Sequence, residues 1–268
     1  MSRRALYLVS GGAGGLFSGL VGGGGGAIMV PIMTGPLRME QHLAHGTSLA
    51  IIILTALAAA LTYSSHGHFD AQLAASMMVA ATIAAFCGAR VARRIPALRL
   101  RQLFAVFLIA VALRLLVMPS IDPVFGHADA TTWTVGPAIG FAGGFLSGAL
   151  GVGGGAVFVP ALVLVLGLEQ HDAQGISLWV VVAATIAGAL THHRQGTVDL
   201  RAVAWMTPLS IPAGVAGAYI ADALGARTLQ VVVSGILVAV GIQMFTTAAR
   251  RLRQQRQATM LRAGSAAP

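Results

Sequence analysis

The sequence predicts an all-α polytopic membrane protein built from two homologous, inverted repeats of four apolar segments each. Three observations lead to this prediction: an apolar composition, an internal repeat, and arginines that stand at the ends of apolar runs. Hydrophobic residues fill 56% of the 268 positions and charged residues only 9%, whereas soluble domains carry about 25% charged residues. The single cysteine, Cys87, excludes an intramolecular disulfide.

The internal repeat is carried by a glycine-rich motif that occurs twice. The first copy, GGLFSGLVGGGGGAIMVP, begins at Gly14, and the second, GGFLSGALGVGGGAVFVP, begins at Gly143. The offset of 129 residues continues without a gap through the Glu-Gln-His triplets that end at His42 and His171. This repeat divides the chain into a first transmembrane repeat (1–118), a connecting loop (119–133), a second transmembrane repeat (134–249) and an Arg-rich cytoplasmic tail (250–268).

Each half contains four apolar segments. They lie near 5–36, 43–63, 71–92 and 100–118 in the first half, and near 135–166, 173–191, 200–221 and 228–248 in the second. The leading segment is too long for one straight crossing and contains a glycine run followed by a proline, both unfavourable inside a helix. It is therefore expected to form a broken or re-entrant helix.

Arginine placement favours the re-entrant arrangement. If each leading segment returns to its side of origin, each half crosses the membrane three times and the two halves are inverted. The loop 90–101, the N-terminus and the Arg-rich C-terminus then share the cytoplasmic side, and only Arg227 is misplaced. Inverted repeats with interrupted helices are typical of secondary transporters, whose substrate site lies at the repeat interface.

The glycine runs are the candidate substrate site. A half-helix that begins after such a run directs free N–H groups and the positive end of its dipole toward the break, where they can bind an anion. The alternative is that the glycines only allow close helix packing, for which the spacing of Gly15 and Gly19 is suited. The candidate residues are Gly22, Gly24, Gly25 and Gly26 in the first run and Gly151, Gly153, Gly154 and Gly155 in the second.

Three hydroxyl groups follow the glycine runs. Thr47, Ser48 and Ser177 stand early in the second segment of each half, and Ile176 replaces the threonine in the second half. These hydroxyls could donate to substrate oxygens, or they could bond to the backbone of their own helix.

The titratable residues give two candidates for proton coupling and two candidate helix caps. His42 and His171 could carry a coupled proton, or their Glu-Gln-His turns could cap the helices that follow. No carboxylate falls in the middle of an apolar segment, so coupling through a buried acid is not expected. Asp70 and Asp199 are expected to cap the third segment of each half. No metal site, cofactor or catalytic residue is predicted.

The paired motifs that end at Pro31 and Pro160, the Gly46-Thr47-Ser48 triplet and the Gly-x-x-Asp loops make the sequence resemble the sulfite exporter TauE/SafE family of bacterial membrane permeases. The resemblance implies transport of small anions such as sulfite, organosulfonates or related carboxylates. It also implies a multi-pass protein of the bacterial inner membrane, and the arginine placement predicts that both termini are cytoplasmic.

The function expected from the sequence is therefore secondary transport of a small anion. The alternatives are a non-transporting membrane subunit or scaffold and, less favoured, an intramembrane enzyme. The expected partners are the anion and the lipid bilayer, and a homo-oligomer is compatible with the sequence. The net charge of +9 does not indicate a nucleic-acid partner, because the arginines stand at the ends of apolar runs, as in loops beside anionic lipids.

Overall fold

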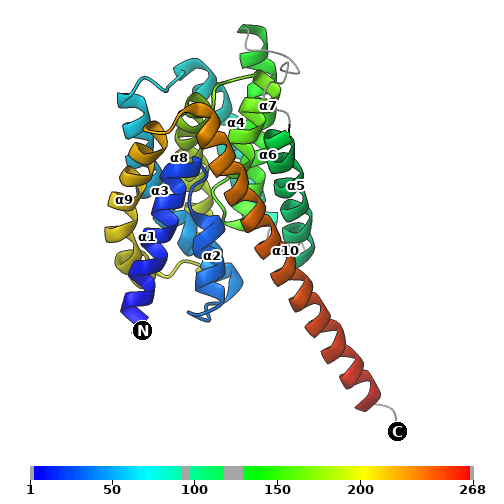
Figure 1. Cartoon of the computed structure of the whole chain (residues 1–268). Helices are drawn as coiled ribbons and strands as arrows, with labels where there is room; N and C mark the ends of the chain where they lie inside the picture. The colour runs from blue at the N-terminus through cyan, green and yellow to red at the C-terminus, as the bar shows by residue number, and fades with distance from the viewer. Residues whose placement is uncertain (1–2, 92–96, 118–128, 266–268) are drawn as a thin grey trace.

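The computed structural model describes residues 3–91, 97–117 and 129–265, so residues 119–128 of the connecting loop lie outside the description. The described residues form ten α-helices and no strand, which confirms the all-α prediction (Figure 1). The helices are α1 (Arg3–Val21), α2 (Gly26–Thr34), α3 (Gln41–Ser65), α4 (Ala71–Val91), α5 (Ala97–Val117), α6 (Asp129–Leu150), α7 (Gly155–Leu166), α8 (Gln170–Arg194), α9 (Leu200–Asp222) and α10 (Ala226–Ser265).

Five of these helices are long and apolar enough to cross a membrane: α3, α4, α8, α9 and α10 over Ala226–Arg250. Two shorter apolar helices cover Gln102–Val117 and Gly155–Leu166. The offset of 129 residues holds in the structure, since α3 and α8 begin and end at equivalent positions. The chain is therefore a multi-pass membrane protein in which each half repeats the same helix order.

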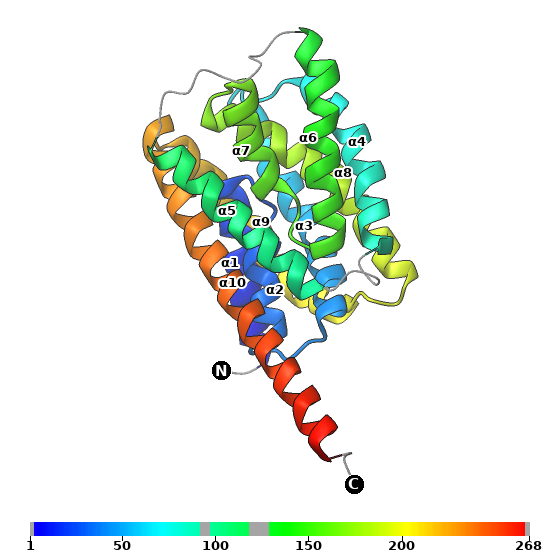
Figure 2. The ribbon, with the colours of Figure 1, turned by 90° about the vertical axis from the view of Figure 1, so that its right-hand side faces the viewer.

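Both leading segments are broken at the glycine runs, as the sequence predicts. The first run separates α1 from α2, and the second separates α6 from α7. After the break, α2 turns back along α1, so that the side chain of Met29 lies against Gly14. In the second half the ring of Phe158 lies against Gly143 in the same way. Each leading segment is thus a helical hairpin rather than one long helix (Figures 1 and 2).

The glycines before each break pack one half onto the other. Helix α1 lies along α9, and α6 lies along α4. A Cβ added at any of these glycines would overlap a backbone carbonyl of the facing helix, so the helices approach as closely as backbones allow. We name these residues the two glycine stripes: Gly11, Gly15 and Gly19 of α1, facing Met206, Ser210 and Gly214, and Gly140, Gly144 and Gly148 of α6, facing Met77, Ala81 and Ala85.

Helices α3 and α8 pack against each other at the centre of the bundle and run antiparallel. Gly46, near the start of α3, lies against Thr197 just after the end of α8. Gly175, near the start of α8, lies against His68 just after the end of α3. The equivalent ends of these two helices therefore lie at opposite ends of the molecule.

Helices α5 and α10 also run antiparallel. Their contact explains why an arginine, Arg227, stands at the start of α10. The guanidinium group of Arg227, at the start of α10, donates to the carbonyls of Leu115 (3.4 Å) and Leu116 (3.3 Å) in the last turn of α5. The last carbonyls of a helix lack intrahelical donors. Arg227 therefore supplies donors to the last carbonyls of α5. This structural role explains its position without reference to the side of the membrane on which it lies.

The Arg-rich tail continues the last helix. Helix α10 runs to Ser265 without interruption and projects beyond the rest of the bundle (Figures 1 and 2). The described ends of the chain, at the start of α1 and the end of α10, lie at the same end of the molecule.

Candidate functional site

The two glycine breaks meet inside the bundle. In the first break Gly22, Gly24 and Gly25 have φ of 68°, 82° and 71°, and in the second Gly151, Gly153 and Gly154 have φ of 66°, 97° and 81°. Only glycine adopts this left-handed region readily. A Cβ built on Gly24 would lie 3.1 Å from the Cα of Gly153. The structure therefore brings together the two glycine runs that the sequence nominated, with backbone against backbone.

Each break also faces the first turn of the half-helix from the other repeat. Gly26, the first residue of α2, lies against the carbonyl of Gly151. Gly155, the first residue of α7, lies against the carbonyl of Gly22. The N-terminal ends of two half-helices, with their partial positive charge, thus converge on one region of the interior.

Some of the backbone N–H groups at these helix N-termini already donate to carbonyls of the glycine turns. The amide of Gly26 donates to Gly24 O at 2.8 Å, and the amides of Val157 and Phe158 donate to Gly154 O at 2.8 and 3.1 Å. In the described part of the chain, the amides of Ala27, Gly155 and Ala156 have no acceptor. Helix N-termini leave such amides available to donate to a ligand.

Two serines tie each break to the opposite half. The Ser48 hydroxyl donates to Gly151 O at 2.7 Å and also lies 2.8 Å from His45 O. The Ser177 hydroxyl donates to Gly22 O at 2.9 Å. Both side chains are fully buried. Of the three candidate hydroxyls, these two lie at the breaks, where they bond to the backbone.

Thr47 lies elsewhere. Its hydroxyl accepts the backbone N–H of Asp199 at 2.9 Å, just before α9. The Asp199 carboxylate in turn accepts from the amides of Arg201 and Ala202, at 2.9 and 3.1 Å. Asp70 accepts in the same way from the first turn of α4. Both aspartates therefore cap their helices, as predicted, and Thr47 supports one of the caps.

His45 and Gln174 are neighbours of the breaks that the sequence did not single out. A Cβ built on Gly151 would lie 2.6 Å from the Cα of His45, and one built on Gly22 would lie 3.0 Å from the Cα of Gln174. These two residues occupy equivalent positions in the repeat. Each stands three residues before a buried serine and therefore on the same helix face. That spacing from the two candidate serines is the feature of the sequence that could have identified His45 and Gln174 as neighbours of the breaks.

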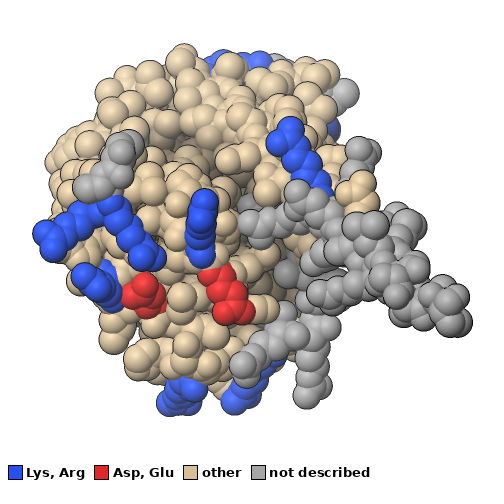
Figure 3. Space-filling view, turned by 90° about the horizontal axis from the view of Figure 1, so that it is seen from below, with Lys and Arg blue, Asp and Glu red and all other residues tan. Residues whose placement is uncertain are grey.

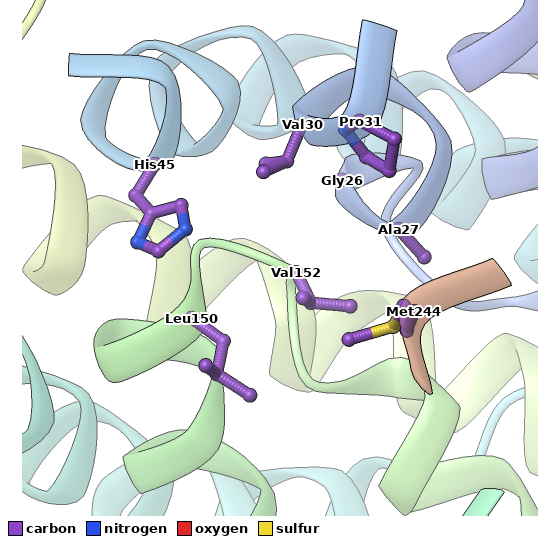
Figure 4. Close-up of a pocket in the computed structure, with 8 residues that line it drawn as sticks. All are labelled: Gly26, Ala27, Val30, Pro31, His45, Leu150, Val152 and Met244. Carbon is purple, nitrogen blue, oxygen red and sulfur yellow. The ribbon is translucent and has the colours of Figure 1, made fainter. Parts of the chain in front are cut away.

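A small cavity of about 10 Å³ lies beside the second break (Figure 4). Its lining joins α2, the start of α3, the second break and α10 through Gly26, Ala27, Val30, Pro31, His45, Leu150, Val152 and Met244. This volume is about that of one water-sized probe. The breaks are therefore closed against each other, and this cavity has no room for a molecule of several heavy atoms.

His42 and His171 are not brought together. They stand near the starts of α3 and α8, which lie at opposite ends of the molecule. The His171 Nε2–H donates to the carbonyls of Ala221 and Leu224, both at 3.1 Å. The His42 ring lies 6.3 Å from the ring of His45. Among the described residues, no group of three or more His, Cys, Asp or Glu side chains is arranged to hold a metal ion.

Apolar helices that pack through glycine stripes around two facing helix breaks define a polytopic membrane protein of the transporter type. The chain belongs to the family "Sulfite exporter TauE/SafE", whose sequence profile matches residues 1–115 and 137–267.

Several curated relatives are similar over most of the chain. The probable membrane transporter protein YunE of Bacillus subtilis is 25% identical over 262 residues, which cover 89% of this chain and 96% of the relative. YdhB of the same organism, also a probable membrane transporter protein, is 27% identical over 69% of this chain and 77% of its own. A probable membrane transporter protein of Xylella fastidiosa (strain Temecula1) is 28% identical over 87% of this chain and 91% of its own. No solved structure gives a significant match.

Proposed function

We propose that this protein is a secondary transporter that moves a small anion across the bacterial inner membrane. The substrate class is sulfite, an organosulfonate or a related oxyanion or carboxylate. The observation that carries this proposal is the meeting of the two glycine breaks, because it directs two half-helix N-termini to one point in an apolar interior. The family match and the names of the relatives support transport.

The proposed anion site consists of Gly22, Gly24, Gly25 and Gly26 with Ser48, and of Gly151, Gly153, Gly154 and Gly155 with Ser177. The amides of Ala27, Gly155 and Ala156 would donate to the anion. The two serines release their carbonyl partners when the breaks separate, and their hydroxyls then become donors to the substrate. Thr47 takes no part, since it bonds to the start of α9.

We further propose that the two halves are inverted in the membrane and that transport proceeds by alternating access. The antiparallel courses of α3 with α8 and of α5 with α10 support inversion, since these pairs are repeat equivalents. Inverted halves around a central site can open to either side by similar movements. The closed contact of Gly24 with Gly153 corresponds to an occluded state of such a cycle.

The charge distribution supports cytoplasmic termini. Figure 3 views the end of the molecule that carries both termini, and arginine side chains are spread over it. A cavity of about 350 Å³ at the starts of α1 and α9 is lined by Arg3, Arg4, Tyr7, Asp199, Arg201 and Trp205. Arginine clusters with interfacial Trp and Tyr are typical of the cytoplasmic boundary of bacterial membranes. We therefore propose that this end faces the cytoplasm.

Uptake of labelled sulfite and sulfoacetate by reconstituted liposomes tests the proposal. We expect wild-type uptake and its loss in Gly24→Val and Gly153→Val, because valine adds atoms between the breaks and is strained at positive φ. Gly225→Ala is the control, since a Cβ there meets nothing within 4 Å. Wild-type uptake rates in both valine variants would overturn the proposed site.

Because the valine variants could fail to fold, a second measurement tests anion binding on the wild-type protein alone. An anion that binds the folded wild-type protein and not the unfolded chain raises its melting temperature, and the rise grows with the anion concentration. We expect sulfite or a sulfonate to do so when chloride at equal ionic strength does not. If no anion of the panel raises the melting temperature or is taken up, the transport proposal is wrong.

A further inference from the structure

Four titratable side chains meet at the end of the molecule opposite the termini. His66 and His68 lie at the turn between α3 and α4, Asp172 in the first turn of α8, and Asp222 at the end of α9. We name them the turn cluster. Because its members come from both halves, it fastens the α3–α4 turn of the first half to two helices of the second.

His68 is the centre of the turn cluster, because each of its ring nitrogens faces a carboxylate. Nδ1 lies 2.8 Å from Asp172 Oδ1, and Nε2 lies 3.4 Å from Asp222 Oδ1. A neutral imidazole has one N–H and one lone pair, so it can donate to only one of these carboxylates. The imidazolium ion has an N–H on each ring nitrogen, so it can donate to Asp172 and at the same time form an ion pair with Asp222. The geometry is therefore complete only when His68 holds a second proton.

His171 restricts where that charge resides. Its ring stacks on the His68 ring with centroids 5.2 Å apart and planes 23° apart. Two stacked imidazolium ions would repel each other. The Nε2–H of His171 already donates to two carbonyls near the end of α9, which a neutral ring can do. The pair thus accommodates one added proton, and the carboxylates place it on His68.

A chain of contacts joins His68 to the first glycine break. The His68 ring meets the ring of Tyr63 edge-on at 6.3 Å. The Tyr63 hydroxyl contacts the side-chain oxygen of Gln174 and lies 3.0 Å from Gly19 O. The Gln174 amide donates to Leu20 O at 3.1 Å, and the side chain lies against Gly22. These contacts join the α3–α4 turn to the end of α1.

The opposite end of the bundle repeats this chain without its titratable terminus. The offset of 129 residues places His192 at the position of Tyr63, and His192 Nε2 lies 3.3 Å from Gly148 O, the equivalent of Gly19 O. Thr197 stands at the position of His68, and Leu43 at that of Asp172. In the parts of the chain that the structure describes, the histidine between two carboxylates is thus present at one end alone.

We propose that His68 is the proton-binding site of this transporter and that its protonation closes the end of the bundle at the α3–α4 turn. The proton comes from the aqueous phase, to which the side chains of His68 and Asp172 are 25% and 41% exposed. It adds to the free ring nitrogen and converts the neutral ring into an imidazolium ion. When the proton leaves, one carboxylate contact is lost, and the longer one, to Asp222, is the one expected to break.

The inference rests on the proposed function for its role in transport, but proton binding itself can be tested separately. Other titratable groups belong to the elements packed around His68, and any of them could add to a pH response. They are Tyr63 and His66 of the α3 end, Asp70 before α4, His171 and Asp172 of α8, and Tyr219 and Asp222 of α9. Single substitutions are therefore needed to assign the site.

Trp179 is a built-in reporter of the α3–α4 turn. Its indole N–H donates to the Ser64 hydroxyl at 2.9 Å, and its ring lies 5.7 Å from the ring of Phe69. In a Trp133→Phe, Trp205→Phe background, reconstituted in lipid nanodiscs with EDTA, Trp179 is the only tryptophan. If His68 binds a proton, we expect the emission of Trp179 to change in one step as the pH is lowered.

The step should disappear in His68→Gln. His193→Gln, which changes an exposed histidine at the far end of α8, is the control and should keep the step. An unchanged step in His68→Gln, or no step in the wild type, would overturn the assignment.

Transport gives a second readout. We expect an imposed pH gradient to change anion uptake in the wild type, and His68→Gln to retain uptake driven by the anion gradient but lose this response. A response of equal size in His68→Gln would overturn proton coupling through this residue. If no anion is transported at all, the proposed function fails, while the Trp179 step still decides whether His68 binds the proton.

Discussion

The hydroxyl of Ser48 donates to the carbonyl of Gly151, which lies 103 residues further along the chain in the glycine break of the other half. Its repeat equivalent, Ser177, donates in the same way to Gly22. Each half thus holds the break of the other half closed. A change at one serine is therefore expected to act on the opposite half.

Removing these hydroxyls tests the crossed contact. Ser48→Ala and Ser177→Ala each leave a buried carbonyl without this donor, and we expect each to lower the free energy of unfolding by about 1–3 kcal/mol. Denaturant titration in detergent measures this loss. Ser65→Ala is the matched control, since Ser65 is exposed and bonds within its own helix. Losses no larger than that of the control would show that the crossed bonds do not stabilise the fold.

The glycine stripes make a prediction about packing. A Cβ at Gly15 or Gly144 would overlap a backbone carbonyl, of Ser210 or Ala81. Backbone cannot yield as a side chain can, so we expect Gly15→Ala and Gly144→Ala to destabilise the protein by about 1–3 kcal/mol. Gly235→Ala in α10, where a Cβ meets nothing within 4 Å, should leave the melting temperature unchanged or raise it. Equal melting temperatures for all three variants would contradict the close approach of the helices.

Substitutions of Thr47 test whether its hydroxyl stabilises the fold or binds the substrate. Thr47→Val removes the acceptor for the Asp199 amide, and we expect a loss of about 1 kcal/mol in the free energy of unfolding. The KM for the anion should stay unchanged, because the residue lies away from the breaks. Thr47→Ser restores the acceptor and should restore the stability. A raised KM at full stability in Thr47→Val would return this hydroxyl to the substrate site.

Inversion of the halves can be tested by labelling. Ser65 and Arg194 occupy equivalent positions at the ends of α3 and α8, and both are exposed. In a Cys87→Ser background, a membrane-impermeant maleimide should reach Ser65→Cys from one side of the membrane and Arg194→Cys from the other. Labelling of both from the same side would exclude inverted repeats.

The sequence predicted the break positions because glycine runs and prolines act locally on the helix. The correspondence between the two halves was also predictable from the sequence, since the repeat offset places the ends of α3 and α8 at equivalent residues. The two caps at Asp70 and Asp199 follow from short-range chemistry and were predicted for the same reason.

Contacts between the halves were harder to predict. A repeat does not say which half a given helix packs against, so the bond from Ser48 to Gly151 and the contact of Thr47 with Asp199 had no local signal. The turn cluster was missed for the same reason. His68 and Asp172 are 104 residues apart, and their repeat equivalents, Thr197 and Leu43, carry no charge. His42 and His171, although repeated, lie at opposite ends.

The glycine stripes make the two halves of the chain dependent on each other for folding. Since α1 packs on α9 and α6 packs on α4, each stripe finds its partner in the other half of the chain. A single half alone would leave its stripe without the facing helix, so each half needs the other to complete its closest helix packing.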